Sequence, residues 1–346
     1  MPTNADVARR RLANQRLVGP SFRSVVDAVG RLGAVQAQDY AGAKWALAQR
    51  VAKATDASIE LLLANGSILR THVLRPTWHL VLPADIRWML ALTAPRVMAA
   101  MAFHGRWLEI TPKMCARAND AMARALAGGN HLTRADLATA LAKVRIDASN
   151  GQRVGHLLMQ AELDAVICSG ARRDKQITYA LLDERAPATP ALDRDEALAQ
   201  LAARYFATRG PATVQDFAWW SGLSVKDAKR GAEAAGPQRT LRATKPTPSV
   251  HLLPNYDEFF IAYRDRSAIL ERVTDAAPMQ RDTALYAHVI EIDGQLVGGW
   301  KRIVKGNAVA VATTYLATVT AAERRAVDSQ IARYKAFLGG SGEVSS

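Results

Sequence analysis

The sequence predicts an α+β protein in which helices predominate and short hairpins recur. Two observations predict this class. Amphipathic helical segments follow one another along the chain, and groups of them are followed by two short apolar strands around a polar turn. Such helix–helix–hairpin groups are typical of winged-helix domains. We therefore expect three tandem winged-helix units at residues 1–110, 111–190 and 191–338, with a flexible tail at 339–346.

The first unit is expected to begin with two helices. An arginine-rich helix is predicted at residues 6–17, and Ser21 can cap a second helix at residues 21–32. A shorter helix is expected at residues 58–64. Residues 68–82 then alternate around a central proline turn, which predicts the first hairpin.

The second unit repeats this order. Helices are expected at residues 112–126, from Thr133 and at residues 151–166. Asp136 stands three residues after Thr133, which resembles a capping box. Residues 167–182 predict a second hairpin with a basic tip.

The third unit is expected to end in a β-meander and a closing helix. Thr213 with Asp216, and Ser224 with Asp227, repeat the capping pattern of the second unit. The expected features are a linker at residues 187–190, helices at 196–208, 213–221 and 224–235, a basic loop at 239–249, a strand from His251, a meander at 286–292, 295–304 and 307–314, and a helix at 320–338.

The charge balance predicts a polyanionic partner. The 346 residues carry a formal net charge of +13, and such a field attracts nucleic acid above all. A membrane surface is the competing partner, but the chain shows neither a run of about 18 apolar residues nor a basic amphipathic anchor. Residues 1–16 are polar and arginine-rich without an apolar signal segment. We therefore expect a cytoplasmic, nucleoid-associated protein that binds DNA and no membrane.

Cysteine and histidine usage predicts no metal and no cofactor. Cys115 and Cys168 are the two cysteines of the chain, and they lack metal-ligand spacing. This usage suits a reducing compartment.

The most informative stretch runs from Gly33 to Tyr40. It contains Gln36 and Gln38, separated by Ala37, and we call residues 36–38 the glutamine motif. An extended backbone would direct both amides to one side, whereas a helix would place them about 200° apart. A carboxamide offers one acceptor oxygen and two donor hydrogens, so two of them can hold a water or contact a base edge. The alternative is two solvated polar residues near a turn.

The residues around the motif resemble a known family. Residues 32–40, followed by Lys44-Trp45-Ala46-Leu47, are similar to the AlkZ-type DNA glycosylases, which are tandem winged-helix proteins with a catalytic Gln-apolar-Gln motif. Residues 255–266 also resemble this family. The resemblance extends from the arginine-rich first helix to the strand at residues 298–300.

The resemblance implies both a shape and an activity. Family members are C-shaped, with a basic channel and the glutamine motif at its centre, so Gln36 and Gln38 are the implied catalytic residues. The implied enzyme is a monofunctional DNA glycosylase that hydrolyses the N-glycosidic bond of cationic alkylated purines in duplex DNA. N7 and N3 adducts and interstrand crosslinks are the candidate lesions. The sequence leaves open which lesion is preferred and whether the base is flipped.

The chemistry of neutral amides fits this activity. An undamaged purine is a poor leaving group that needs an acid, whereas a purine alkylated at N7 or N3 is already cationic. Carboxamide oxygens can position water and stabilise positive charge on the sugar without a buried carboxylate. Asp39 is expected to be a helix cap or a salt-bridge partner rather than a base. No catalytic lysine stands out, so we expect hydrolysis only.

Basic side chains are expected to contact DNA. The candidates are Arg70, His72, Arg75, His79, Arg172, Arg173, Lys175, Arg264, Lys301 and Arg302. Two more residues are expected to shape the channel. Trp78 is expected to lie in the core with His79 alternating outward, and Asp257 is expected to pair with Arg264.

Two other functions are also consistent with the sequence. One is a non-enzymatic winged-helix transcriptional regulator, and the other is an architectural DNA binder without chemistry. A regulator usually dimerises to contact two half-sites, but several units sit in this one chain and no coiled-coil seam is evident. We therefore expect a monomer bound to one duplex site.

Overall fold

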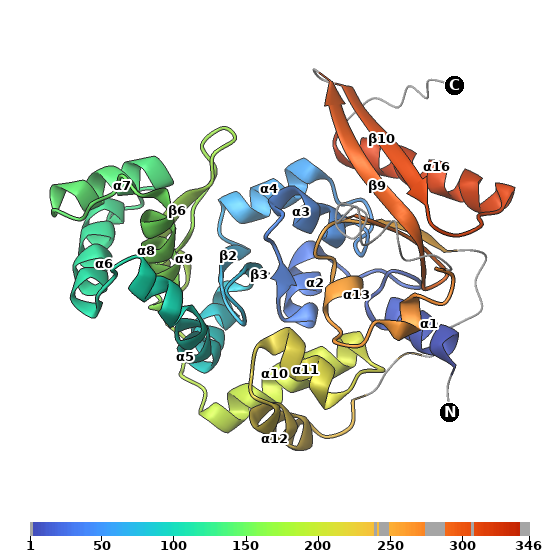
Figure 1. Cartoon of the computed structure of the whole chain (residues 1–346), viewed down its shortest axis with the longest axis horizontal. Helices are drawn as coiled ribbons and strands as arrows, with labels where there is room; N and C mark the ends of the chain where they lie inside the picture. The colour runs from blue at the N-terminus through green and yellow to red at the C-terminus, as the bar shows by residue number, and fades with distance from the viewer. Residues whose placement is uncertain (1–2, 239–240, 242–248, 274–287, 306–307, 340–346) are drawn as a thin grey trace. The chain divides into compact units, whose positions relative to one another are not determined.

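The computed structural model is an α+β fold in which helices predominate, as expected (Figure 1). It describes residues 3–238, 241, 249–273, 288–305 and 308–339. Contacts divide the chain into two compact units. Unit 1 comprises Met1–Glu60, Ala202–Trp220 and Ala235–Ser346, and unit 2 comprises Leu61–Leu201 and Ser221–Ala234. The three winged-helix units remain a prediction.

Unit 1 begins with short, well-capped elements. The elements are α1 (Asn4–Asn14), α2 (Val25–Leu32), β1 (Val35–Gln36) and α3 (Tyr40–Ala48). Thr3 and Asp6 form a capping box at the start of α1, which satisfies amide groups that would otherwise lack partners. The expected cap of α2 was wrong: Ser24, rather than Ser21, accepts a hydrogen bond from the Asp27 N–H.

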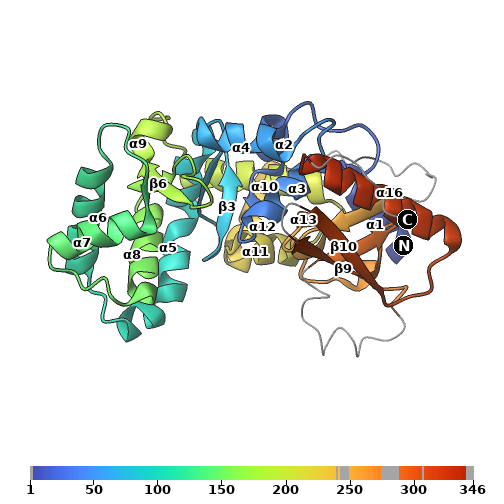
Figure 2. The ribbon, with the colours of Figure 1, turned by 90° about the horizontal axis from the view of Figure 1, so that it is seen from above.

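A four-stranded antiparallel sheet completes unit 1. Its strands are β7 (Val250–Leu253), β8 (Val289–Ile292), β9 (Gln295–Lys305) and β10 (Ala308–Tyr315), in the order β10-β9-β8-β7. The expected meander is thus present, and β7 extends it. Helix α16 (Ala321–Phe337) packs against β7 and α3 (Figures 1 and 2). Trp45 of α3 meets Tyr334 and Phe337 of α16, with ring centroids 5.0 and 5.1 Å apart.

The core of unit 1 joins residues distant in sequence. Leu12 of α1, Phe259 of α13 (Glu258–Ile261) and Val289 of β8 belong to one buried cluster. The short helix η1 (Ser267–Ile269) adds Ile269 to this cluster. Burying each such side chain contributes about 1.5–3 kcal/mol, so this cluster fixes α1 and α13 against the sheet.

Unit 2 contains two hairpins, and both were predicted from the sequence. The first pairs β2 (Leu69–His72) with β3 (Trp78–Val81), and the second pairs β5 (Ile167–Ser169) with β6 (Thr178–Leu181). Strand β4 (Leu132–Thr133) adds to the second hairpin through β6. Strand β2 packs against β5 and α8 (Gly151–Leu163), so the two hairpins are neighbours within this unit.

Helices cover the second hairpin of unit 2. Leu126, Leu137 and Leu157 belong to a buried cluster with Ile167 and Tyr179 of the hairpin. The remaining helices of unit 2 are α5 (Pro83–Trp107), α6 (Pro112–Leu126), α7 (Arg134–Lys143), α9 (Leu182–Arg185) and α12 (Val225–Ala235). The predicted helices at 112–126, 151–166 and 224–235 agree with α6, α8 and α12.

Three helices besides α12 contain a sequence boundary between the units. They are α4 (Asp56–Ala64), α10 (Arg194–Arg209) and α11 (Val214–Ser221), and each agrees with a predicted helix. The predicted linker at 187–190 has no regular secondary structure. Of two further predictions, the basic loop at 239–249 lies mostly outside the described residues, and the tail lies there except for Gly339.

The longest helix was not predicted. No element was expected at residues 83–111, where α5 extends from Pro83 to Trp107 with Pro95 inside it. Among the described residues, α5 is long and apolar enough to cross a membrane by length and composition alone, and 44% of its most apolar window is buried. Helix α5 packs against α8 within unit 2.

Candidate active site

The glutamine motif lies in a short extended segment of unit 1. Gly33 ends α2 with a φ of 78°, a left-handed conformation that glycine adopts without strain. Val35 and Gln36 then form β1, and Asp39 begins α3. The extended backbone predicted for this stretch is therefore present at Val35–Gln36. Gln36 is buried and Gln38 is exposed.

A buried ion pair contacts this segment. Arg209, at the end of α10, donates from Nη2 and Nε to Oε2 of Glu258 over 2.7 and 3.1 Å. Both side chains are buried, with exposed fractions of 0 and 1%. Trp220 Nε1–H donates to the same oxygen over 2.8 Å, and the Arg209 guanidinium lies 4.3 Å from the centre of the Trp220 ring.

The remaining polar atoms of the pair are directed at the backbone before and within the motif. The Gln36 N–H donates to Oε1 of Glu258 over 3.0 Å. Arg209 donates to the carbonyl oxygens of Leu32 and Ala34 over 2.9 and 3.1 Å. The pair therefore holds this stretch of backbone at three alternate positions.

Asp39 caps the helix that follows the motif. Its Oδ1 accepts a hydrogen bond from the Gly42 N–H over 3.0 Å, as expected of an N-cap. Asp39 also lines a pocket of about 440 Å³ together with Trp45, Trp300 and Tyr334. The residue directly after the glutamine motif thus lines a pocket within unit 1.

The charged lining of this pocket comes mainly from the β8–β9 region. His288, Lys301 and Arg302 all line it, and the last two are exposed. The Asn255 N–H donates to Nδ1 of His288 over 3.2 Å. Burial lowers the pKa of His288 below its ordinary 6.5; the Asp39 carboxylate opposes this shift and Arg302 adds to it. The pocket therefore combines two cations with an imidazole that is neutral near pH 7.

A second buried ion pair lies beside the first. Asp257 accepts from both terminal nitrogens of Arg50, over 2.7 and 2.8 Å, and Arg50 also donates to Gln15 and to the Ala46 carbonyl. The expected pair of Asp257 with Arg264 was therefore wrong. Asp257 caps α13 and points into the core, whereas the Arg264 side chain is exposed.

A buried lysine lies shortly after the motif. Lys44 Nζ is 2.8 Å from a carboxylate oxygen of Asp56 and 2.8 Å from one of Glu60. The Lys44 side chain is 3% exposed. Glu60 also accepts from the Tyr40 hydroxyl over 2.8 Å. Two carboxylates therefore share this ammonium.

The first hairpin lies in unit 2, and most of its predicted DNA contacts are buried. Arg70 is buried with its guanidinium 4.2 Å from the centre of the Trp78 ring, and His72 makes a short hydrogen bond to Glu162. His79 is 0% exposed, so the expectation that it faces outward was wrong. Both faces of β3 are covered after Trp78, which removes the alternation on which that expectation relied.

Two predicted site residues of this hairpin remain accessible. Arg75 and Trp78 are partly exposed, although Trp78 was expected in the core. The ring centroid of Trp78 lies 4.3 Å from that of the buried His72.

Comparison with known proteins identifies the family. A family model described as "DNA glycosylase AlkZ-like" matches residues 29–337, which is most of the chain. This chain belongs to the AlkZ-like DNA glycosylases. It is therefore a DNA repair enzyme, as the resemblance implied, and the regulator and the architectural binder are set aside.

Relatives agree in sequence and in fold. An "Interstrand DNA cross-link repair glycosylase" from Streptomyces sahachiroi is 26% identical over 326 residues, covering 84% of this chain and 85% of that protein. The solved structure of "Streptomyces sahachiroi DNA glycosylase AlkZ" superposes with a TM-score of 0.77 at 24% identity and covers 98% of each chain. This second likeness supports the fold.

The second hairpin of this AlkZ-like enzyme carries the basic tip that the sequence predicted. Arg172, Arg173 and Lys175 lie in the connection between β5 and β6, and the last two are exposed. Arg173 pairs with Asp136 over 3.0 Å and donates to the His131 carbonyl. Contact of this tip with DNA remains a prediction.

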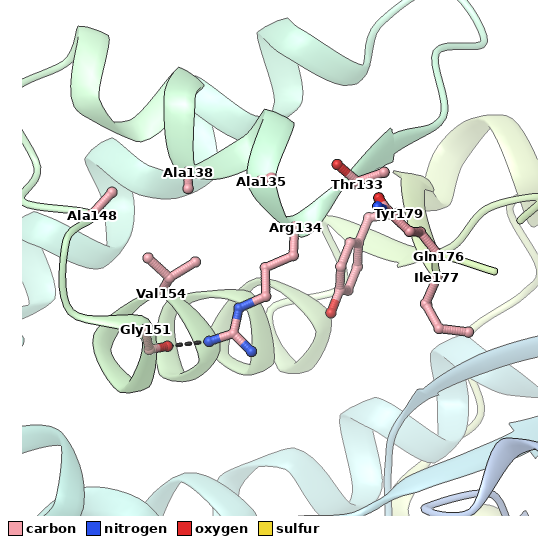
Figure 3. A pocket seen from close by; sticks show the side chains of 10 residues that line it. All are labelled: Thr133, Arg134, Ala135, Ala138, Ala148, Gly151, Val154, Gln176, Ile177 and Tyr179. Carbon is pink, nitrogen blue, oxygen red and sulfur yellow. Dashed lines mark hydrogen bonds between the residues drawn. The ribbon is translucent and has the colours of Figure 1, made fainter. Parts of the chain in front are cut away.

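A further pocket of the AlkZ-like chain lies beside this hairpin in unit 2. It measures about 510 Å³, and Figure 3 shows the Arg134 side chain lying between the Tyr179 ring and Gly151. Arg134 donates a short hydrogen bond to the Gly151 carbonyl. The walls are otherwise mostly apolar, with Val154 and Ile177 among them, and no residue of the predicted site lines this pocket.

Neither member of the ion pair at the motif was predicted from the sequence. Glu258 lies in the stretch that resembles the family, but no role was assigned to it, and Arg209 was not singled out. The available signal was a pair of adjacent acids, Asp257 and Glu258, followed by Phe259 and Phe260, because acids in an apolar surrounding require buried partners. No group of three or more His, Cys, Asp or Glu side chains that could hold a metal ion occurs in the described part of the chain.

Proposed function

We propose that this enzyme hydrolyses the N-glycosidic bond of purines alkylated at N7 or N3 in duplex DNA, with Gln36 and Gln38 as catalytic residues. One observation carries the proposal: the Gln36 backbone is hydrogen-bonded to a fully buried ion pair in a chain of a DNA glycosylase family. The Streptomyces relative is named for interstrand cross-link repair, which supports including crosslinks through alkylated purines among the substrates.

The reaction needs little acid catalysis from the protein. When the bond between the sugar carbon and the base nitrogen breaks, its electron pair goes to the cationic base, which leaves neutral. Water forms the new bond to the sugar carbon and releases its proton to solvent. The carboxamide oxygens of Gln36 and Gln38 orient this water and stabilise the positive charge that develops on the sugar. A neutral amide does so without the cost of desolvating a carboxylate.

The reaction ends at hydrolysis. Cleavage of the opened sugar would require an amine nucleophile. Lys44 is the buried lysine closest in sequence to the motif, and its ammonium is shared by Asp56 and Glu60. We therefore propose that it stabilises the start of α4 against α3 and forms no covalent intermediate.

Duplex DNA is held by exposed and partly exposed cations in this proposal. Lys301 and Arg302 lie at the pocket beside Asp39, and Arg75, Arg173 and Lys175 lie on the two hairpins of unit 2. They contact phosphates and carry no sequence information, which suits an enzyme that acts on damage. One copy of the chain supplies both the motif and the cations, so we propose a monomer.

Removal of each amide tests the proposal. Duplex DNA with a single N7-methylguanine is incubated with excess enzyme, and abasic sites are cleaved with alkali and counted on a gel. We expect Gln36→Ala and Gln38→Ala each to lower the excision rate about 10- to 1000-fold, the range for losing one preorganised dipole. Wild-type rates in both variants would refute the assignment.

An Asp39 variant separates capping from catalysis in the same assay. Asn caps helices as well as Asp does but carries no charge. We expect Asp39→Asn to keep the wild-type excision rate and thermal midpoint. A collapsed rate in a folded Asp39→Asn protein would instead make Asp39 a base.

A further inference from the structure

The buried pair of Arg209 and Glu258 contacts the protein backbone at the glutamine motif. We propose that Arg209 and Glu258 are positioning residues for catalysis, which fix the backbone that carries Gln36. This inference rests on the proposed catalytic role of Gln36. Neither residue reaches solvent, so neither contacts the substrate.

The hydrogen bonds of the pair join its own members, the segment before and within the motif, and the side chains of Thr208 and Trp220. Glu258 accepts from Gln36 on Oε1, and from Arg209 and Trp220 on Oε2. Arg209 donates to Leu32 and Ala34 in addition to Glu258. In extended backbone, the polar groups of alternate residues point to the same edge, so Ala34 and Gln36 present a carbonyl and an N–H to one ion pair.

The free-energy cost of burying this ion pair indicates that the arrangement has a function. A buried ion pair is often no more stabilising than apolar residues of similar volume, because two charges must be desolvated. The cost is tolerable here because every nitrogen of the Arg209 guanidinium and both oxygens of Glu258 have partners. What apolar residues could not replace are the directional bonds to the backbone at Leu32, Ala34 and Gln36.

Positional precision is what such bonds provide. A catalytic amide acts only when its oxygen lies within hydrogen-bonding distance of the water or the sugar in the transition state. Displacement by about 1 Å can cost about 100-fold in rate. The Gln36 side chain extends from the residue whose N–H is held by Glu258, so loss of that bond releases the backbone on which the amide depends.

The second buried pair provides an internal control. Arg50 and Asp257 are as buried as Arg209 and Glu258, and Asp257 is the neighbour of Glu258 in sequence. The hydrogen bonds of Arg50 go to Gln15, Ala46 and Asp257, away from the motif. A third buried acid, Glu291, pairs with His251 over 2.5 Å. The Arg50–Asp257 pair and Glu291 therefore provide a buried arginine and a buried glutamate in unit 1 that do not contact the motif through any bond named above.

Two matched pairs of variants test the inference. Arg209→Lys keeps the charge but lacks the forked guanidinium that contacts Leu32, Ala34 and Glu258 together. Glu258→Gln is nearly isosteric, but its amide meets N–H donors on both sides and can accept on only one. The matched controls are Arg50→Lys and Glu291→Gln.

The measurements separate rate, affinity and stability. Single-turnover excision of N7-methylguanine is measured at saturating enzyme, together with duplex affinity and the thermal midpoint. We expect Arg209→Lys and Glu258→Gln to lower the saturating rate about 10- to 100-fold, as for a displaced catalytic group, with affinity within about threefold of wild type. The controls should lose comparable thermal stability but keep the rate within about threefold.

A milder variant covers the case in which these proteins fail to fold. Trp220→Phe keeps the buried ring and removes one donor from Glu258. We expect it to lower the saturating rate about threefold to tenfold, the loss for a small displacement of the amide.

Specific results would overturn the inference. Equal rate losses in Glu258→Gln and Glu291→Gln at equal thermal midpoints would reduce the pair to a purely structural role, as would a wild-type rate in Trp220→Phe. Failure of the proposed function looks different: the wild-type enzyme would leave N7-methylguanine in place, or Gln36→Ala would excise it at the wild-type rate.

Discussion

Gln36 and Asp39 stand three residues apart and are held by different interactions. The backbone of Gln36 is held by the buried carboxylate of Glu258, whereas the side chain of Asp39 is occupied by the first turn of α3. The bond to Glu258 positions the backbone that carries the Gln36 amide, and the Asp39 carboxylate caps a helix. At the scale of residues, this division is why two amides, rather than the adjacent acid, are assigned the reaction.

His288 provides a pH prediction at the same scale. Burial holds its pKa below 6.5, so the unfolded chain binds a proton before the folded chain does as the pH falls. The stability that His288 contributes is therefore complete above pH 6.5 and decreases as the pH falls through the folded pKa. NMR titration of its ring, assigned with His288→Asn, should give a midpoint below 6.5.

The charges around His288 sharpen this prediction. Removing the cation with Arg302→Gln should raise the midpoint of His288, and removing the anion with Asp39→Asn should lower it further. A wild-type midpoint at or above 6.5, or no response to either substitution, would contradict the described environment of the ring.

Among single residues, those fixed by local sequence were predictable, and those fixed by distant partners were not. The extended backbone at Gln36 and the cap at Asp39 follow from local features, namely Gly33 before them and the helix after them. The partners of Glu258 and Asp257 do not, because Arg209 lies 49 residues from Glu258 and Arg50 lies 207 residues from Asp257. Asp257 and Glu258 are adjacent acids that pair with different arginines. The local sequence does not show which arginine each one contacts.

At the scale of elements, caps and hairpins were the predictable parts. Thr133 with Asp136, Thr213 with Asp216 and Ser224 with Asp227 all make the expected side-chain bonds at helix starts. Their signals are local, because each satisfies amide groups within one turn. Helix α5 is difficult to predict from local sequence because Pro95 lies inside it, and proline normally ends or kinks a helix. Its packing against α8 outweighs that local preference.

The basic tip between β5 and β6 provides a prediction about affinity. Lys175 is exposed there, and each phosphate contact contributes about 0.9 to the slope of log affinity against log salt concentration. We expect Lys175→Ala to reduce this slope by about one while leaving the saturating excision rate unchanged. Filter binding at several salt concentrations measures it.

A matched lysine controls for net charge. Lys143 is exposed at the end of α7 in the same unit, and Lys143→Ala removes the same charge from a helix end. Identical salt slopes for wild type and Lys175→Ala would exclude the tip from the DNA contact. Identical decreases in both variants would attribute the effect to net charge alone.

At the scale of the whole molecule, charge and family agree. A net charge of +13 predicted a polyanionic partner, and a family match over residues 29–337 makes that partner the DNA on which glycosylases act. The fold class followed from the helix and hairpin pattern. The division into two discontinuous units did not, because it depends on which distant segments share a core.

In the proposed mechanism, two neutral amides suffice because the departing base already carries a positive charge. The most direct measurement compares single-turnover excision from two duplexes, one with N7-methylguanine and one with hypoxanthine, a neutral purine lesion. We predict that the cationic base is released and that hypoxanthine leaves at least about 100-fold more slowly, since its departure needs an acid that amides cannot supply. Release of both bases at similar rates would contradict the account.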